Sequence, residues 1–159
     1  MKSLGQISFT LLIVSASILN SVATADVIPS GQTFNCTPTH VWDGDGPIWC
    51  EEGTKIRLAG IAAREINDEC LVGHPCPRES GKNSRAGLVS ILGEPVGTGA
   101  HGHILVRGPT LRCKSAGSAK GSRTAAWCIT EAGLDVNCTM VKKRWAARWA
   151  AYWGAHSCD

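Results

Sequence analysis

Two acids in a tight turn, a later acid and two arginines are the residues of this sequence best suited to chemistry. Asp43 and Asp45 flank a glycine, Arg57 opens a short apolar run, Glu65 follows that run, and Arg123 lies far downstream. Carboxylates can hold a divalent cation and orient a water molecule, and guanidinium groups can neutralise a phosphate. The set predicts metal-assisted hydrolysis of a phosphodiester bond.

Three short strands are expected to position these residues. Residues 39–42 and 48–50 are rich in β-branched and aromatic side chains and are separated by a turn of Asp, Gly and Pro. Residues 55–61 have the composition of a third strand. In an antiparallel meander, the turn would lie at one rim and Arg57 would project from a strand that faces it. Residues 67–77, with two cysteines and two prolines, are expected to form an irregular loop.

The rest of the chain predicts one helix, two more strands and a second helix. Ser80 can cap a helix that runs to residue 92, where Gly93 provides a stop. Residues 103–106 and 124–129 are expected as strands joined by a polar, glycine-rich connection at 114–122, and Asn137 is expected to cap the second helix. This order predicts a mainly β (α+β) fold, a five-stranded antiparallel barrel of the OB type with two or three flanking helices.

The first 25 residues have the pattern of an export signal: a charged start, an apolar core and a small-residue cleavage site. Residues 26–159 are then expected to form one domain, secreted or periplasmic, monomeric and without membrane contact after signal removal. The formal net charge of +3 becomes about +2 when Lys2 is lost, so charge alone does not establish a nucleic-acid partner.

Eight cysteines follow the expected signal and could form four disulfides in an oxidising compartment. No Cys-x-x-Cys pair is present, which argues against a zinc site. Spacing does not determine the connectivity. Sequential pairing is the first hypothesis to test, and it joins Cys36 with Cys50, Cys70 with Cys76, Cys113 with Cys128, and Cys138 with Cys158.

The order and spacing of the acids and arginines resemble the thermonuclease, or staphylococcal-nuclease-like, family. The family pattern Asp-Gly-Asp-Thr, followed by Arg-Leu-x-x-Ile-Asp-x-Pro-Glu, is similar to residues 43–46 and 57–65. A Gly-Arg pair at a strand start resembles Ser122-Arg123, and the helix entry Val-Asn-x-x-Leu-Val resembles residues 136–141. The likeness extends from about Thr39 to Trp149.

This resemblance implies an OB-type barrel and calcium-dependent cleavage of DNA and RNA, with single-stranded or frayed nucleic acid as the expected substrate. It implies that Asp45 binds Ca²⁺ or another hard divalent cation. Arg57 and Arg123 would contact the scissile phosphate and stabilise its developing charge. Glu65 would position or deprotonate the attacking water.

Several positions depart from the family pattern. Ala62 replaces the second aspartate ligand, and Gly46, Ala63 and Arg64 replace a threonine, a threonine and a proline. Loss of a carboxylate predicts weaker cation binding, because Ca²⁺ takes about 6 to 8 oxygen ligands. Whether Asp43, Asp68 or Glu69 substitutes is open. The main alternative is therefore a catalytically impaired nucleic-acid-binding module, and a weaker one is a disulfide scaffold for a protein or glycan partner.

Two aromatic and histidine patterns have competing interpretations. Trp145, Trp149 and Trp153 recur every four residues near basic side chains, which suits either base stacking or packing against the barrel, and packing is favoured. His101 and His103 could bind a metal, but a solvated loop or strand edge is favoured. The glycosylation acceptor pattern occurs at residues 35–37 and 137–139. It does not bear on function, because glycosylation depends on the organism that makes the protein.

Overall fold

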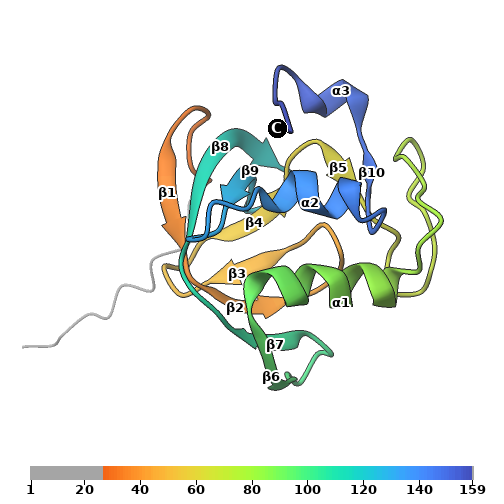
Figure 1. Cartoon of the computed structure of the whole chain (residues 1–159), viewed down its shortest axis with the longest axis horizontal. Coiled ribbons are helices and arrows are strands. Elements are labelled where there is room, and N and C mark those ends of the chain that lie inside the picture. The colour runs from red at the N-terminus through yellow and green to blue at the C-terminus, as the bar shows by residue number, and fades with distance from the viewer. Residues whose placement is uncertain (1–26, 159) are drawn as a thin grey trace, which may run out of the picture.

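The computed structural model of the protein describes residues 27–158, so the expected signal at 1–25 lies outside the described residues. This part of the chain is mainly β, with a curled eight-stranded sheet, a two-stranded sheet and three helices (Figure 1). Helices α1 and α2 lie on the same side of the curled sheet in this view. No helix among residues 27–158 is long and apolar enough to cross a membrane.

The large sheet has the strand order β1-β8-β9-β4-β3-β2-β7-β6. Its strands are β1 (Thr33–Cys36), β2 (Pro38–Val41), β3 (Ile48–Cys50), β4 (Lys55–Leu58), β6 (Glu94–Thr98), β7 (Ile104–Arg107), β8 (Leu111–Ala119) and β9 (Arg123–Ile129). The predicted antiparallel meander is confirmed in β2, β3 and β4. However, β4 pairs with β9 in parallel, where a fully antiparallel arrangement was expected.

The sheet curls where the chain passes from one strand directly into the next, from β1 to β2 and from β7 to β8. Only Thr37 separates β1 from β2, yet β1 pairs with β8 while β2 pairs with β3 and β7. In these pairings Cys36 lies opposite Leu111, and His40 lies opposite Leu105. The concave side encloses a core of buried aliphatic side chains that includes Ile48, Ile56, Leu58, Leu88, Leu92 and Leu111.

Helix α1 (Gly81–Leu92) confirms the prediction made from its end signals. The Ser80 side chain accepts a hydrogen bond from the Asn83 N–H, and Gly93 follows the last turn. Helix α2 (Val136–Lys142) is capped by Asp135, whose side chain accepts from the Cys138 N–H. The predicted cap at Asn137 is wrong, because Asn137 is the second residue of the helix. Its fully buried side chain donates to the carbonyl oxygens of Ala59 and Ala126.

The predicted polar connection at 114–122 is also wrong over most of its length, because β8 continues to Ala119. Leu111, Cys113 and Ser115 alternate inward along β8, and the small Ser, Ala and Gly residues that follow disguise this period in the sequence. Strands β1 and β6 were not expected.

The three tryptophans that recur every four residues do not share one helix. Trp145 packs over Gly87 of α1, Trp149 precedes the short helix α3 (Ala150–Trp153), and Trp153 is buried. Between them, β10 (Ala147–Arg148) pairs with β5 (Ile61–Ala62) in the small sheet. Packing was the favoured role for these rings, and buried Trp153 fulfils it in the core.

All four sequential disulfides are present, joining Cys36 to Cys50, Cys70 to Cys76, Cys113 to Cys128, and Cys138 to Cys158. Cys113 and Cys128 are directly opposed on neighbouring strands, so sheet register brings them together. Three of the bridges tie strands and the C-terminal segment to the core, and the Cys70–Cys76 bridge closes a loop on itself.

Candidate functional site

The Asp-Gly-Asp turn between β2 and β3 is pressed against α1 and the segment after β5. A Cβ on Gly44 would collide with Ser84 Cβ and lie 2.9 Å from Ala63 Cβ. Gly46 has φ of 118°, and a Cβ there would lie 2.6 Å from the Ile56 carbonyl oxygen. The threonine of the family pattern therefore does not fit at this position. These contacts fix the direction of the two aspartates.

Asp45 and Arg57, which were expected to lie near each other, form an ion pair. Arg57 Nη2 donates to Asp45 Oδ2 at 3.0 Å, and the Ala63 N–H donates to the same oxygen at 2.9 Å. Arg57 Nη1 donates to the carbonyl oxygens of Leu58 and Ile61, each at 3.0 Å. The guanidinium therefore ties the Asp-Gly-Asp turn to the bend that links β4 with β5.

Asp43, which the sequence left open, lies between Asp45 and Glu65. It is only 5% exposed, and its Oδ1 accepts a hydrogen bond from the Asp45 N–H at 3.2 Å. The half-buried Glu65 is close enough for its charge to raise the pKa of Asp43. We call Asp43, Asp45 and Glu65 the acid cluster. The other two candidate acids stay outside it: Asp68 accepts from the Gly81 N–H, and the side chain of Glu69 is exposed.

Burial and mutual repulsion perturb the acid cluster. Burial, followed by the charge of Asp45, raises the pKa of Asp43 to about 8. Burial also raises the pKa of Asp45, although Arg57 and the Ala63 N–H oppose the shift. The pKa of Glu65 is raised by burial and then by Asp45. Three acids thus share one arginine as their permanent counter-charge.

His74 and Trp149 complete the surroundings and were missed as site residues. The His74 ring lies 4.2 Å from the Trp149 ring, and Arg57 Cζ lies 5.5 Å from the same tryptophan. His74 is close enough to Asp45 and Glu65 to lower the pKa of both. One sequence signal could have pointed to His74: the Cys70–Cys76 pair closes a short loop directly after Glu65.

Arg123 does not join the other predicted site residues. Its Nε donates to the Lys120 carbonyl oxygen at 2.9 Å, and no bond to the acid cluster occurs within residues 27–158. In the β4–β9 register Arg57 lies opposite Ala125, so Arg123 is two residues away on the same face of the sheet. The structure brings together Asp45, Arg57 and Glu65, but Arg123 lies two residues before Ala125, the residue of β9 that is opposite Arg57.

The acid cluster has the right donor chemistry for a hard cation but is not tightly converged. Ala62, where the family pattern has an aspartate, is 0% exposed and pairs with Ala147. Within residues 27–158, three potential ligand atoms lie within 4.8 Å of one another in only two groups, and neither contains a member of the acid cluster. Three carboxylates can bind calcium only if their side chains draw closer.

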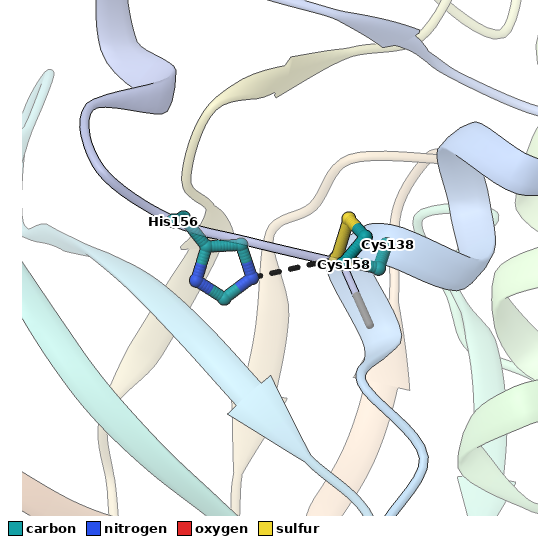
Figure 2. Close-up of side chains that lie close together, drawn as sticks. All are labelled: Cys138, His156 and Cys158. Atoms are coloured by element: carbon teal, nitrogen blue, oxygen red, sulfur yellow. Dashed lines mark hydrogen bonds between the residues drawn. A yellow bond between two sulfur atoms is a disulfide. The ribbon is translucent and has the colours of Figure 1, made fainter.

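Both converged groups contain a disulfide. In one of them, shown in Figure 2, His156 Nε2 lies 3.4 Å from Cys138 Sγ, and Cys138 is bonded to Cys158. The other consists of Cys36, Cys50 and Glu52, with the two cysteines likewise joined. Metal binding by cysteine needs a thiolate, which a disulfide does not provide. In this state both groups are structural anchors.

Comparisons with protein-family models, curated proteins and solved structures found no match. The function must therefore be argued from the site itself. Chemically, the site offers buried carboxylates for a cation and a water molecule, beside a guanidinium that suits a phosphate.

Proposed function

We propose that the protein is a thermonuclease-like enzyme that hydrolyses phosphodiester bonds of DNA or RNA, preferably single-stranded, with Ca²⁺ or another hard divalent cation. One observation carries the proposal: Asp43 and Asp45 are buried beside Glu65, and Arg57 is the only permanent counter-charge that acts on them in the described part of the chain. Burying unbalanced negative charge is costly, and a bound cation would relieve that cost.

Each residue has a distinct role in this proposal. Asp45 and Asp43 would hold the cation, which when bound supplies positive charge to polarise the phosphate and acidify a water molecule. Glu65 is half-buried at the edge of the cluster, and its raised pKa suits acceptance of a proton from the attacking water. Arg57 is held on three sides and offers a fixed guanidinium to the phosphate.

The role of Arg123 requires a movement. Its guanidinium must release the Lys120 carbonyl oxygen to reach a phosphate held beside Arg57. That exchange is feasible because the bond is exposed and Arg123 shares a face of the sheet with Arg57. Arg123→Ala is therefore expected to lower turnover less than Arg57→Ala.

The proposal extends to the fold. If β1 with β2 and β7 with β8 are each treated as one bent strand, the sheet becomes a closed barrel of five strands. The pairings β1–β8 and β2–β7 support this closure, and the short edge strand β6 lies outside it. A closed five-stranded barrel is the OB arrangement that the family resemblance implies. Four disulfides further support an exported, secreted or periplasmic protein.

A second candidate is a nucleic-acid-binding module without turnover. Ala62 favours it, because this fully buried position supplies no carboxylate and the acid cluster remains loosely converged. Arg57 would still bind a phosphate in such a module. The two candidates differ only in whether the bound strand is cut.

One experiment separates them. The mature protein is incubated with plasmid and with single-stranded DNA in Ca²⁺, Mg²⁺, Mn²⁺ or a chelator, together with Glu65→Gln and Arg57→Ala. Cutting that requires a metal and is lost in both variants supports the enzyme. DNA binding without cutting in any metal supports the module. Absence of both activities would reject the proposed function.

A further inference from the structure

Five aromatic or imidazole rings gather on a partly exposed surface outside the acid cluster. They are His40 of β2, Trp42 after it, Trp49 of β3, and His101 and His103 before β7. We call them the tryptophan–histidine surface. His103 lies at its centre, 4.9 Å from Trp42, 4.5 Å from Trp49, and 6.3 Å from each of the other two imidazoles, measured between ring centroids.

The surface is held in place by α1. Arg85 Nη1 donates to the Trp42 carbonyl oxygen at 3.2 Å and to the Gly102 carbonyl oxygen at 3.0 Å. One side chain thus fixes both the turn that carries Trp42 and the turn that carries His101 and His103. A surface that is ordered before binding loses little conformational entropy when it binds.

Basic groups lie beside these rings. Lys55 Nζ lies 5.9 Å from the Trp49 ring centroid. Burial lowers the pKa of His103, and the charges of His40, His101 and Arg85 lower it further. The surface therefore collects groups that are cationic or become so on protonation. An anion is the complementary ligand.

We propose that the tryptophan–histidine surface binds a single strand of nucleic acid, with bases against Trp42 and Trp49 and phosphates at the imidazoles and Lys55. Aromatic rings interleaved with basic groups suit such a strand, because every base has a flat face and every linkage carries a negative charge. An uncharged glycan would use the rings but not the cations. The inference rests on the proposed function for its link to cleavage: Trp42 directly precedes Asp43, so one strand could contact this surface and the acid cluster.

Acidic pH should strengthen this binding. Burial, followed by the charges of His40, His101 and Arg85, lowers the pKa of His103, so this central imidazole gains its positive charge only at acidic pH. Its protonation adds a cation beside Trp42 and Trp49, so affinity for a phosphate chain is expected to rise as pH falls.

The test measures fluorescence anisotropy of a labelled oligothymidylate in a chelator, where no metal-dependent cutting can occur. The matched probe is an abasic oligomer of equal length, which keeps the phosphates and lacks the bases. We expect the abasic probe to bind wild type about tenfold more weakly than the oligothymidylate, and Trp49→Ala to lose most of this difference. His101→Gln, which replaces an exposed side chain, should weaken binding. Lys143→Gln, at the exposed C-cap of α2, is the control for general charge.

The outcomes separate this inference from the proposed function. Equal affinity for the two probes, no binding by wild type, or an unchanged base dependence in folded Trp49→Ala would overturn the inference. If Trp49→Ala does not fold, the test uses His101→Gln and Lys55→Gln instead. Affinity for the oligothymidylate equal to that of wild type in both variants would overturn the inference. Base-dependent binding without metal-dependent cutting would retain the inference and reject the enzyme. Tighter binding of a neutral oligosaccharide than of oligothymidylate would assign the surface to a glycan and also overturn the inference.

Discussion

Two regions of the molecule place acid and histidine side chains close together, and they differ in whether the polar groups are paired within the protein. At the C-terminal anchor, of which Figure 2 shows Cys138, His156 and Cys158, Asp135 Oδ1 accepts from the Cys138 N–H and Asp135 Oδ2 lies 2.8 Å from His156 Nε2. The adjacent sulfurs are joined as a disulfide. In the acid cluster, by contrast, three carboxylates compete for Arg57, and burial raises the pKa of all three.

The difference distinguishes structural from functional groups. A buried polar group that only supports the fold has its hydrogen bonds and charges satisfied within the protein. Groups whose pKa is shifted by burial and by like charges are instead typical of sites that bind a ligand. The anchor is satisfied, whereas the acid cluster lacks positive charge. Four predictions test this contrast.

Removal of Arg57 should have the largest effect. Arg57→Ala leaves buried Asp45 without its ionic partner, and breaking a buried pair from one side costs about 3 to 5 kcal/mol of unfolding free energy. Any cleavage should fall at least about 10²-fold through loss of phosphate stabilisation. Urea unfolding and a cleavage assay measure the two effects. Arg112→Ala, at an exposed position of β8, should change stability by less than about 0.5 kcal/mol. Similar effects of the two substitutions would contradict the role of Arg57.

Removal of the anchor disulfide should cost stability without changing the cation response. Cys138→Ala combined with Cys158→Ala opens a bridge with a sequence separation of 20 residues and should lower the unfolding free energy by about 3 kcal/mol. The acid cluster lies outside this anchor, so added Ca²⁺ should stabilise the variant as much as wild type. Loss of the calcium effect would show that the two regions are not independent.

Replacement of Asp43 should change how stability depends on pH. The pKa of Asp43 is about 8 in the folded chain, against an ordinary value of 3.8, so between these values the folded state holds a proton that the unfolded state lacks. The unfolding free energy must therefore fall as pH rises across this window. The side chain that Asp43→Asn introduces binds no proton. The unfolding free energy of this variant should therefore fall less between about pH 5 and about pH 8 than that of wild type. Equal slopes in urea unfolding would contradict the burial of an unbalanced charge.

Restoration of the missing acid should have the smallest effect. Ala62→Asp adds a carboxylate beside the cluster and should tighten calcium binding roughly tenfold while lowering stability in a chelator. Calorimetric calcium titration measures the affinity. Ala62→Asn has nearly the same shape without the charge and should not tighten binding. Equal affinities for the two variants would show that position 62 does not face the cation.

Much of the frame around the acid cluster was predictable because its signals are local. Ser80 and Gly93 mark the ends of α1, and the Asp-Gly-Asp turn separates two short strands. The spacing of Asp45, Arg57 and Glu65 also predicted their meeting. Strand β8 was missed because small residues obscure its alternation, and its inward side is defined only by its pairing with β1 and β9.

Other parts of the site depend on contacts between distant segments. His74 approaches Trp149 only because the Cys70–Cys76 loop folds toward the segment after β10. Asp43 belongs to the cluster because Gly44 packs against α1 and turns the chain inward. Arg123 had the expected residue type, but its bond to Lys120 depends on the turn between β8 and β9. No local pattern encodes these three arrangements.

The most direct test of the account is the effect of calcium on thermal unfolding at about pH 8, where the acid cluster is more strongly charged than at neutral pH. In wild type, Ca²⁺ up to about 10 mM, above the Kd of weak extracellular calcium sites, should raise the Tm by several degrees. Asp45→Asn should remove this rise while the disulfide-bonded anchor remains intact. No rise in wild type, or an equal rise in Asp45→Asn, would contradict the claim that the buried acids form a cation site.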